Sequence, residues 1–142
     1  MTYFDSCYLA KLYLMEPDSD RVRARAADAA GLVCCAIGRG EVVATFHRHF
    51  REKRLTQREF RLLAAQVEAD LDAGVWTALP VTSALIEAQA QRMATLPATV
   101  FLRAADALHL ACAAEAGLRD VYSSDRHLVA AAQHFGLRAV TL

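Results

Sequence analysis

The amino-acid sequence predicts an α/β/α sandwich with a central, mostly parallel sheet of about five strands flanked by about seven helices. Two observations lead to this prediction. Short apolar segments alternate along the chain with longer segments in which apolar residues recur at helical spacing. Strands separated by one or two helices require right-handed crossovers, which give parallel strands with helices on both faces of the sheet.

The first half of the chain is divided by Pro17 and Gly31. Proline restricts the residue before it and so interrupts a helix, whereas glycine is a favourable residue just after a helix. The expected elements are a strand at Thr2–Asp5, helices at Ser6–Met15 and Asp18–Ala30, a strand at Leu32–Ile37, and a long helix that continues to Lys53.

In the second half, Thr56 followed by Glu59 forms a capping box that starts a helix. A helix that is apolar nearly all round, Phe101–Ala116, is expected to be deeply buried. The full set is a helix from Thr56 to Ala73, a strand at Val75–Leu79, a helix from Thr82 or Ser83 to Leu96, the Phe101–Ala116 helix, a strand at Asp120–Ser123, a helix at Asp125–Phe135 and a strand at Arg138–Leu142.

The amino-acid composition limits the classes of function that the chain can have. The chain has 142 residues, enough for one domain that we expect to span residues 1–142. Because 16 Lys and Arg balance 16 Asp and Glu, it is not a generally basic nucleic-acid binder. Four cysteines without a C-x-x-C pair favour reduced thiols in a cytoplasmic protein. No signal peptide and no run of roughly 18 apolar residues is present, so we expect no membrane association.

Four acids occupy positions that exposure to solvent does not explain. Asp5 closes the first expected strand, Asp125 follows a later one, and Glu41 opens the helix after the second. Asp106 lies within FLRAADALHLACAA, where nearly every neighbour is apolar. The C-terminal ends of parallel strands share one edge of a sheet, so we expect these carboxylates to converge there. Their repulsion would be relieved by Mg²⁺ or Mn²⁺, ions that catalyse phosphodiester hydrolysis.

Each acid also has a purely structural interpretation. Asp5 and Asp125 could cap the helices that follow them, and Glu41 could complement a helix macrodipole from the first turn. Asp106 could form an ion pair with Arg103 on a solvent-facing stripe. The sequence leaves both interpretations open for each residue.

Other constellations are less informative. His47 and His49 have the wrong spacing for a metal pair on one helix face, so zinc is not expected. No glycine-rich phosphate loop and no serine-hydrolase motif is present. The segment from His47 to Arg61 is rich in arginine, and it is either a solvated pair of helices or a phosphate-binding surface.

Four motifs, in order and at matching spacing along almost the whole chain, resemble those of PIN-domain ribonucleases, specifically toxins of the VapC type. YFDSCYLAKLYL is similar to the family's apolar-apolar-Asp-Ser/Thr start, EVVATF to its E-hydrophobic-x-A motif, RAADALHLACAAEAG to its most recognisable stretch, and SSDRHLVAAAQHFGL to its Ser/Thr-x-Asp pattern. The segment CCAIGRG departs from the family, which more often has a Ser/Thr-containing strand end there.

The resemblance implies a cytoplasmic endoribonuclease that cleaves RNA with metal-activated water, as the toxin of a type II toxin–antitoxin system. It implies a homodimer, with apolar and arginine-bearing faces on Ser6–Met15 and Asp18–Ala30, and an antitoxin encoded beside it. It assigns four acids to a Mg²⁺ or Mn²⁺ site and two hydroxyls next to it: Asp5, Glu41, Asp106 and Asp125, with Ser6 and Ser123.

Three other functions stay open. The chain could be a PIN nuclease of RNA processing outside any toxin pair, or a non-catalytic PIN-like module that binds RNA or protein. The third is a phosphotransfer domain, which also binds Mg²⁺ at strand ends. Such a domain needs a lysine on a late strand, whereas both lysines here, Lys11 and Lys53, are early.

Overall fold

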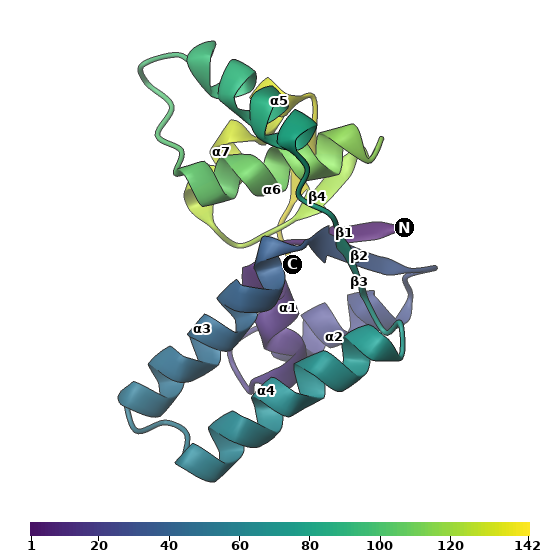
Figure 1. Cartoon of the computed structure of the whole chain (residues 1–142), viewed down its shortest axis with the longest axis vertical. Coiled ribbons are helices and arrows are strands. Elements are labelled where there is room, and N and C mark those ends of the chain that lie inside the picture. Colours follow the sequence, from purple (N-terminus) through teal and green to yellow (C-terminus); the bar gives the residue numbers. More distant parts are fainter.

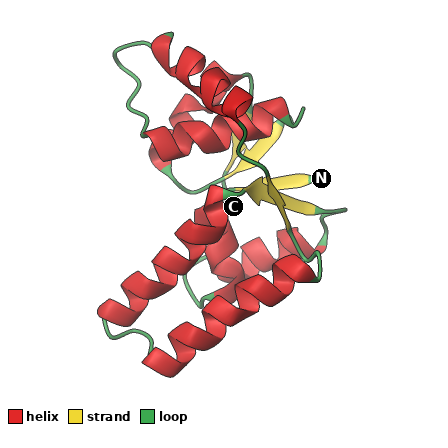
Figure 2. Cartoon of the chain, viewed as in Figure 1, coloured by secondary structure: helices red, strands yellow, loops and turns green.

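In the computed structural model, which describes residues 1–142, five strands form one parallel sheet in the order β3-β2-β1-β4-β5 (Figure 1). All five strands are short and lie at the centre of the molecule, between helices (Figure 2). The expected α/β class with a parallel sheet is confirmed. The strands are β1 (Thr2–Phe4), β2 (Leu32–Cys35), β3 (Thr77–Leu79), β4 (Asp120–Tyr122) and β5 (Arg138–Val140).

The helices form one layer on each side of the sheet (Figure 1). Each layer has its own apolar core, in which Phe46 and Trp76 are fully buried on one side and Leu110 on the other. No helix combines the length and hydropathy that a membrane crossing needs. The first layer holds α1 (Ser6–Tyr13), α2 (Ser19–Ala27), α3 (Ile37–Arg51) and α4 (Gln57–Asp72); the second holds α5 (Ser83–Ala94), α6 (Ala104–Glu115), α7 (Arg126–Ala131) and a 3₁₀ turn at Ala132–Phe135.

The connections that leave β1 and β4 start side by side. β1 is the central strand and pairs with β2 on one side and β4 on the other. The Asp5 amide donates to the Tyr122 carbonyl at 3.1 Å, which places the residues just after β1 and β4 next to each other. In an open parallel sheet, ligand sites form at the point where the strand order reverses. Two of the predicted site residues, Asp5 and Ser123, lie at this point.

The helix that carries Glu41 begins earlier than expected. α3 starts at Ile37, so that Gly38 is helical and Glu41 lies beyond the first turn. The interpretation of Glu41 as a first-turn acid is therefore wrong. Close packing explains the early start: a Cβ on Gly38 would lie 2.4 Å from the Cys34 Sγ atom. Only a glycine lets the helix begin this close to β2.

The helix that carries Asp106 begins later than expected. α6 starts at Ala104, after an extended Arg103, and Asp106 belongs to its first turn. The seven residues from Ala107 to Ala113 are all buried, as predicted for a helix that is apolar nearly all round. Asp106 thus lies at the exposed end of a buried helix rather than in its middle.

Most other boundaries agree with the expected ones within a few residues. The capping box that starts α4 is confirmed, with the Thr56 hydroxyl accepting from the Glu59 amide at 3.2 Å. Thr82 caps α5. The helix expected at Asp125–Phe135 is divided into α7 and the 3₁₀ turn, and it ends at Gly136, whose φ of 74° suits glycine.

We expect Gly38→Ala to destabilise the protein by about 1–3 kcal/mol, the usual cost of overpacking a filled core. Its matched control is Gly40→Ala, because no atom lies within 4 Å of the methyl group added there. That variant should be neutral, or more stable by up to ~1 kcal/mol, since alanine favours a helix over glycine. Urea unfolding followed by circular dichroism measures both free energies.

A second substitution tests the cause. Cys34→Ala removes the sulfur that the new methyl group contacts. The loss of unfolding free energy caused by Cys34→Ala should therefore be smaller in the Gly38→Ala variant than in the parent chain. Equal unfolding free energies for Gly38→Ala and Gly40→Ala would contradict the packing explanation.

Candidate active site

The four predicted acids lie around the C-terminal ends of the three inner strands. Asp5 follows β1 directly, and Asp125 comes three residues after β4. Glu41 is on α3, the helix that follows β2, and Asp106 is at the start of α6. Each of the four therefore reaches this edge of the sheet from a different connection.

Asp5 is the most buried of the four, at 3% exposed. Its carboxylate accepts hydrogen bonds from the Tyr8 amide at 3.1 Å, from the Cys7 thiol at 2.8 Å and from the Ser123 hydroxyl. Burial raises the pKa of Asp5 above its ordinary value, although these donors lower it in part. Asp5 also caps α1, as its structural interpretation requires. The cap uses one carboxylate oxygen, Oδ1, and Ser123 binds the other.

Asp125 and Asp106 share a guanidinium group. Arg103 donates from Nε to Asp106 Oδ2 at 2.8 Å, and from a terminal nitrogen to Asp125 Oδ2 at 2.9 Å. The ion pair between Arg103 and Asp106 that the structural interpretation predicted is present, but Arg103 also extends to a second acid. Arg103 is 59% exposed, whereas the Asp106 side chain is only 14% exposed. The two carboxylates are thus held beside one cation.

Asp125 is fixed from its other side as well. Its Oδ1 atom accepts from the amides of His127 at 2.8 Å and Leu128 at 3.1 Å, so Asp125 caps α7 as expected. Burial raises the pKa of Asp125, but the two amides and the charge of Arg103 outweigh burial and leave the pKa below its ordinary value. The Asp125 amide donates to the Ser123 hydroxyl at 2.9 Å. Ser123 therefore connects Asp125 to Asp5.

Glu41 contacts a histidine rather than the other acids. Its Oε2 atom lies 2.7 Å from His109 Nε2, and His109 Nδ1 lies 2.9 Å from the hydroxyl of Tyr3 on β1. Burial lowers the pKa of His109, but the hydrogen bond and charge of Glu41 more than offset it and raise the net value. Burial raises the pKa of Glu41, and the histidine and the Ser6 hydroxyl bring it below the ordinary value.

Sequence reasoning missed His109 and Cys7 as parts of this region. His109 lies three residues after Asp106, and a basic side chain on a helix that is otherwise apolar is the same kind of signal that singled out Asp106. Cys7 offers no such signal, because a cysteine near apolar residues is ordinarily a small core residue. Burial and the charge of Asp5 raise the pKa of the Cys7 thiol to about 12, so it acts as a neutral donor.

The acids form a linked network and not a closed metal cage. Hydrogen bonds connect Asp5 to Asp125 through Ser123, and connect Asp125 to Asp106 through Arg103. Glu41 joins the others through the nearby charge of Arg103, which lowers its pKa. No three His, Cys, Asp or Glu side chains lie close enough together to hold a metal ion. Convergence of all four carboxylates on one metal centre therefore stays a prediction.

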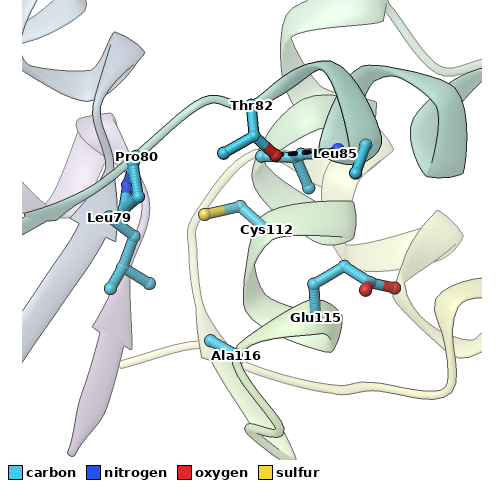
Figure 3. A pocket seen from close by; sticks show the side chains of 8 residues that line it. Leu79, Pro80, Thr82, Leu85, Cys112, Glu115 and Ala116 are labelled. Atoms are coloured by element: carbon cyan, nitrogen blue, oxygen red, sulfur yellow. Dashed lines mark hydrogen bonds between the residues drawn. The ribbon is translucent and has the colours of Figure 1, made fainter.

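A separate pocket on the edge of the sheet contains none of these acids. It has a volume of about 280 Å³ and lies between β3 and the helices α5 and α6 (Figure 3). Leu79, Leu85 and Ala116 make its lining mostly apolar, and Glu115 and Thr82 are its polar side chains. Its lining has no group of acids or histidines. In this it differs from the C-terminal ends of the inner strands, which we call the acidic edge after its four carboxylates: Asp5, Glu41, Asp106 and Asp125.

Comparison with known proteins identifies the family. No curated protein sequence matches the chain. VapC20 from Mycobacterium tuberculosis, described as a sarcin-ricin loop cleaving toxin, has a similar structure, with a TM-score of 0.74 and 18% identity over 92% of this chain and 95% of that one. FitAcB from Neisseria gonorrhoeae has a TM-score of 0.75 and 17% identity over 98% and 96%. A model of the PIN domain matches residues 2–134, and the chain therefore belongs to the PIN-domain family.

Proposed function

We propose that this protein is a cytoplasmic, metal-dependent endoribonuclease that acts as the toxin of a toxin–antitoxin pair. The observation that carries the proposal is the pair of carboxylates, Asp106 and Asp125, that share one cation at the edge of a PIN-domain sheet. The fold shared with VapC20, a toxin that cleaves the sarcin-ricin loop, supports the choice of RNA as substrate.

The chemical type of the candidate ligands fits a hard divalent cation. Every candidate ligand is a carboxylate, the donor type that Mg²⁺ and Mn²⁺ prefer. Arg103 already demonstrates that Asp106 and Asp125 can share a positive charge, and its exposed side chain can rotate away into solvent. Four carboxylates would hold the ion, directly or through water: Asp106, Asp125, Asp5 and Glu41. A bound Mg²⁺ or Mn²⁺ would activate a water molecule and neutralise charge on the scissile phosphate.

The protein's own residues then have distinct roles. Ser123 orients Asp5 and Asp125 at once, because it donates to one side chain and accepts from the amide of the other. His109 orients Glu41, and Tyr3 orients His109 from the central strand. Such supporting hydrogen bonds fix the direction in which a carboxylate presents its free oxygen. No protein nucleophile is needed for this reaction.

The rival functions differ from the proposed one in what each would need or show. A non-catalytic PIN-like module would bind RNA or protein without any effect of a chelator. A PIN nuclease of RNA processing would share the chemistry but lack an antitoxin. Phosphotransfer is the least supported, because Lys11 and Lys53 lie on α1 and just after α3, far along the sequence from the late strands β4 and β5.

We predict that Asp106→Asn abolishes metal-dependent behaviour while the fold persists. Cleavage of total RNA should fall by about 100-fold or more, beyond the effect typical of a residue that only supports a ligand. The rise in melting temperature caused by Mg²⁺ should disappear, since an ion stabilises the native state only while its site exists. Without metal, stability should change by about 1 kcal/mol or less, because the ion pair with Arg103 is partly exposed.

The matched control is Asp120→Asn. Asp120 also pairs with an arginine, Arg138, through contacts of 2.7 Å, but it lies at the opposite edge of the sheet, where β4 begins. It should keep both cleavage and the Mg²⁺-induced rise in melting temperature. A destabilised Asp106→Asn variant that still cleaves RNA would contradict the catalytic role assigned to Asp106.

Arg103→Gln should bind Mn²⁺ several-fold more tightly than the parent protein. In the parent, an ion must displace the guanidinium group from Asp106 and Asp125, and this competition weakens its binding. Isothermal titration calorimetry measures the affinity without reference to catalysis. Arg138→Gln, which removes the arginine from Asp120, should leave the affinity unchanged. Weaker binding by Arg103→Gln would mean that the arginine organises the acids instead of competing for them.

The partners of the proposed toxin are an antitoxin and a second copy of the chain. Apolar side chains of α1, such as Leu9, pack into this chain's own core, so α1 offers less uncovered surface than expected. Exposed apolar side chains lie instead at Met15 and Leu62, beside a groove of about 570 Å³ between the end of α1 and the α3–α4 hairpin. Exposed apolar surface of this kind is typical of protein contacts. Co-purification with the product of the neighbouring gene tests the antitoxin, and light scattering at micromolar concentration tests the dimer.

A further inference from the structure

The hairpin formed by α3 and α4 extends away from the sheet and ends at one pole of the molecule (Figure 1). We call its outer part, residues 47–61, the basic arm. It contains six cationic side chains, all exposed, and only two acids: Arg48, Arg51, Lys53, Arg54, Arg58 and Arg61, with Glu52 and Glu59. The whole chain has no net charge, so the remaining residues carry an excess of four acids. The positive charge is therefore concentrated at this pole.

The two acids of the basic arm are already engaged. Glu52 pairs with Arg54, and Glu59 accepts hydrogen bonds of 2.7 Å from the amide and hydroxyl of Thr56. The other five cations have no carboxylate partner: Arg48, Arg51, Lys53, Arg58 and Arg61. A solvated pair of helices ordinarily places opposite charges beside one another. An uncompensated group of this size is typical of a surface that meets an anion.

Aromatic packing and a capping box hold the two helices of the basic arm together. Phe50 and Phe60 stack with 5.7 Å between ring centroids and an interplanar angle of 7°, and His47 packs against Phe60 at 5.7 Å. The capping box at Thr56 fixes the turn between the helices. The cations are therefore presented on an ordered scaffold, which lowers the entropy lost when a ligand binds.

The arm is continuous with the acidic edge of the sheet. Glu41 and Arg48 are seven residues apart on α3, so they lie on the same face of the helix and about 10 Å apart along its axis. Between them, Ala44 and Thr45 are short side chains that leave this face open. A chain of phosphates bound at Glu41 through a metal ion could follow this face outward to Arg48.

We propose that the basic arm binds the sugar–phosphate backbone of single-stranded RNA on one side of the cleavage point. This inference rests on the proposed ribonuclease function and adds the surface that holds the substrate. RNA is favoured over an acidic protein because Arg48 lies on the face of α3 that also carries Glu41. The apolar groove suited to a protein is lined by Met15, Leu62 and part of the arm, but by only one of the arm's six cations, Arg54. The contacts are to phosphates, so the arm contributes affinity and not sequence preference.

The test compares two triple variants that remove equal charge. The arm variant removes three cations from the basic arm: Arg48→Gln, Arg51→Gln and Arg58→Gln. The control variant removes three exposed arginines far from the arm in the sequence: Arg21→Gln, Arg119→Gln and Arg138→Gln. Binding of a fluorescein-labelled 20-nucleotide RNA is followed by anisotropy in EDTA, so that no cleavage occurs. We expect the arm variant to lose at least tenfold in affinity, and the slope of log K against log salt to become shallower by about 2, since each phosphate contact on a single strand contributes about 0.7.

Three outcomes would overturn the proposal: an arm variant that binds RNA like the parent, a control variant that loses as much affinity, or poly-glutamate of matched charge that displaces the RNA equally well. The last result would identify a surface for an acidic protein.

All substituted residues are exposed, so circular dichroism should show an unchanged fold. With Mg²⁺ present, the arm variant should raise KM for long RNA without a matching loss of kcat. Failure of the parent to cleave any RNA would refute the ribonuclease function, while the EDTA binding data still decide on the arm.

Discussion

Parallel hydrogen bonding of β1 to both β2 and β4 determines where the candidate catalytic residues lie. The connections after these three strands leave from the same edge, so residues 118 positions apart, Asp5 and Ser123, become hydrogen-bonded neighbours. The strands have only three or four residues, and a shift of one residue in their pairing would turn Asp5 to the other face of the sheet. The correct register is therefore a condition for Asp5 and Ser123 to form their hydrogen bond.

The two helical layers are joined at the same place. Tyr3, on the central strand, accepts from the Cys35 amide on β2 and contacts His109 on α6, which in turn contacts Glu41 on α3. This chain of contacts crosses from one layer to the other through the buried Tyr3 and His109 and ends at the half-buried Glu41. Buried polar networks of this kind are costly unless every member is satisfied. Glu41 is thus positioned by the interior of the protein and not by its own helix turn.

The fold could be predicted from the sequence because its signals are local. Alternating apolar segments, Gly136 and the capping box at Thr56 each report on a few neighbouring residues. The start of α3 could not be predicted, because it depends on how closely the helix backbone at Gly38 packs against the Cys34 side chain of β2, and residue spacing does not give that distance. Long-range contacts explain why the site was only partly predicted. Asp5 and Asp125 were recognisable from their positions after strands, and Asp106 from its apolar neighbours. For Arg103 the sequence offered only a possible pair with Asp106, and its second contact, to Asp125, exists only in the folded chain.

The uneven distribution of charge gives this neutral protein a permanent electric dipole. One pole, formed by the end of α3 and the start of α4, is positive, and the balancing acids are spread over the rest of the chain. A polyanion approaching through solution would turn the molecule before touching it, so that the hairpin leads and the acidic edge follows. Such orientation acts on the rate of encounter, and it weakens as ionic strength rises and the Debye length shortens. Neutrality overall would at the same time limit nonspecific attraction between the rest of the surface and cellular nucleic acid.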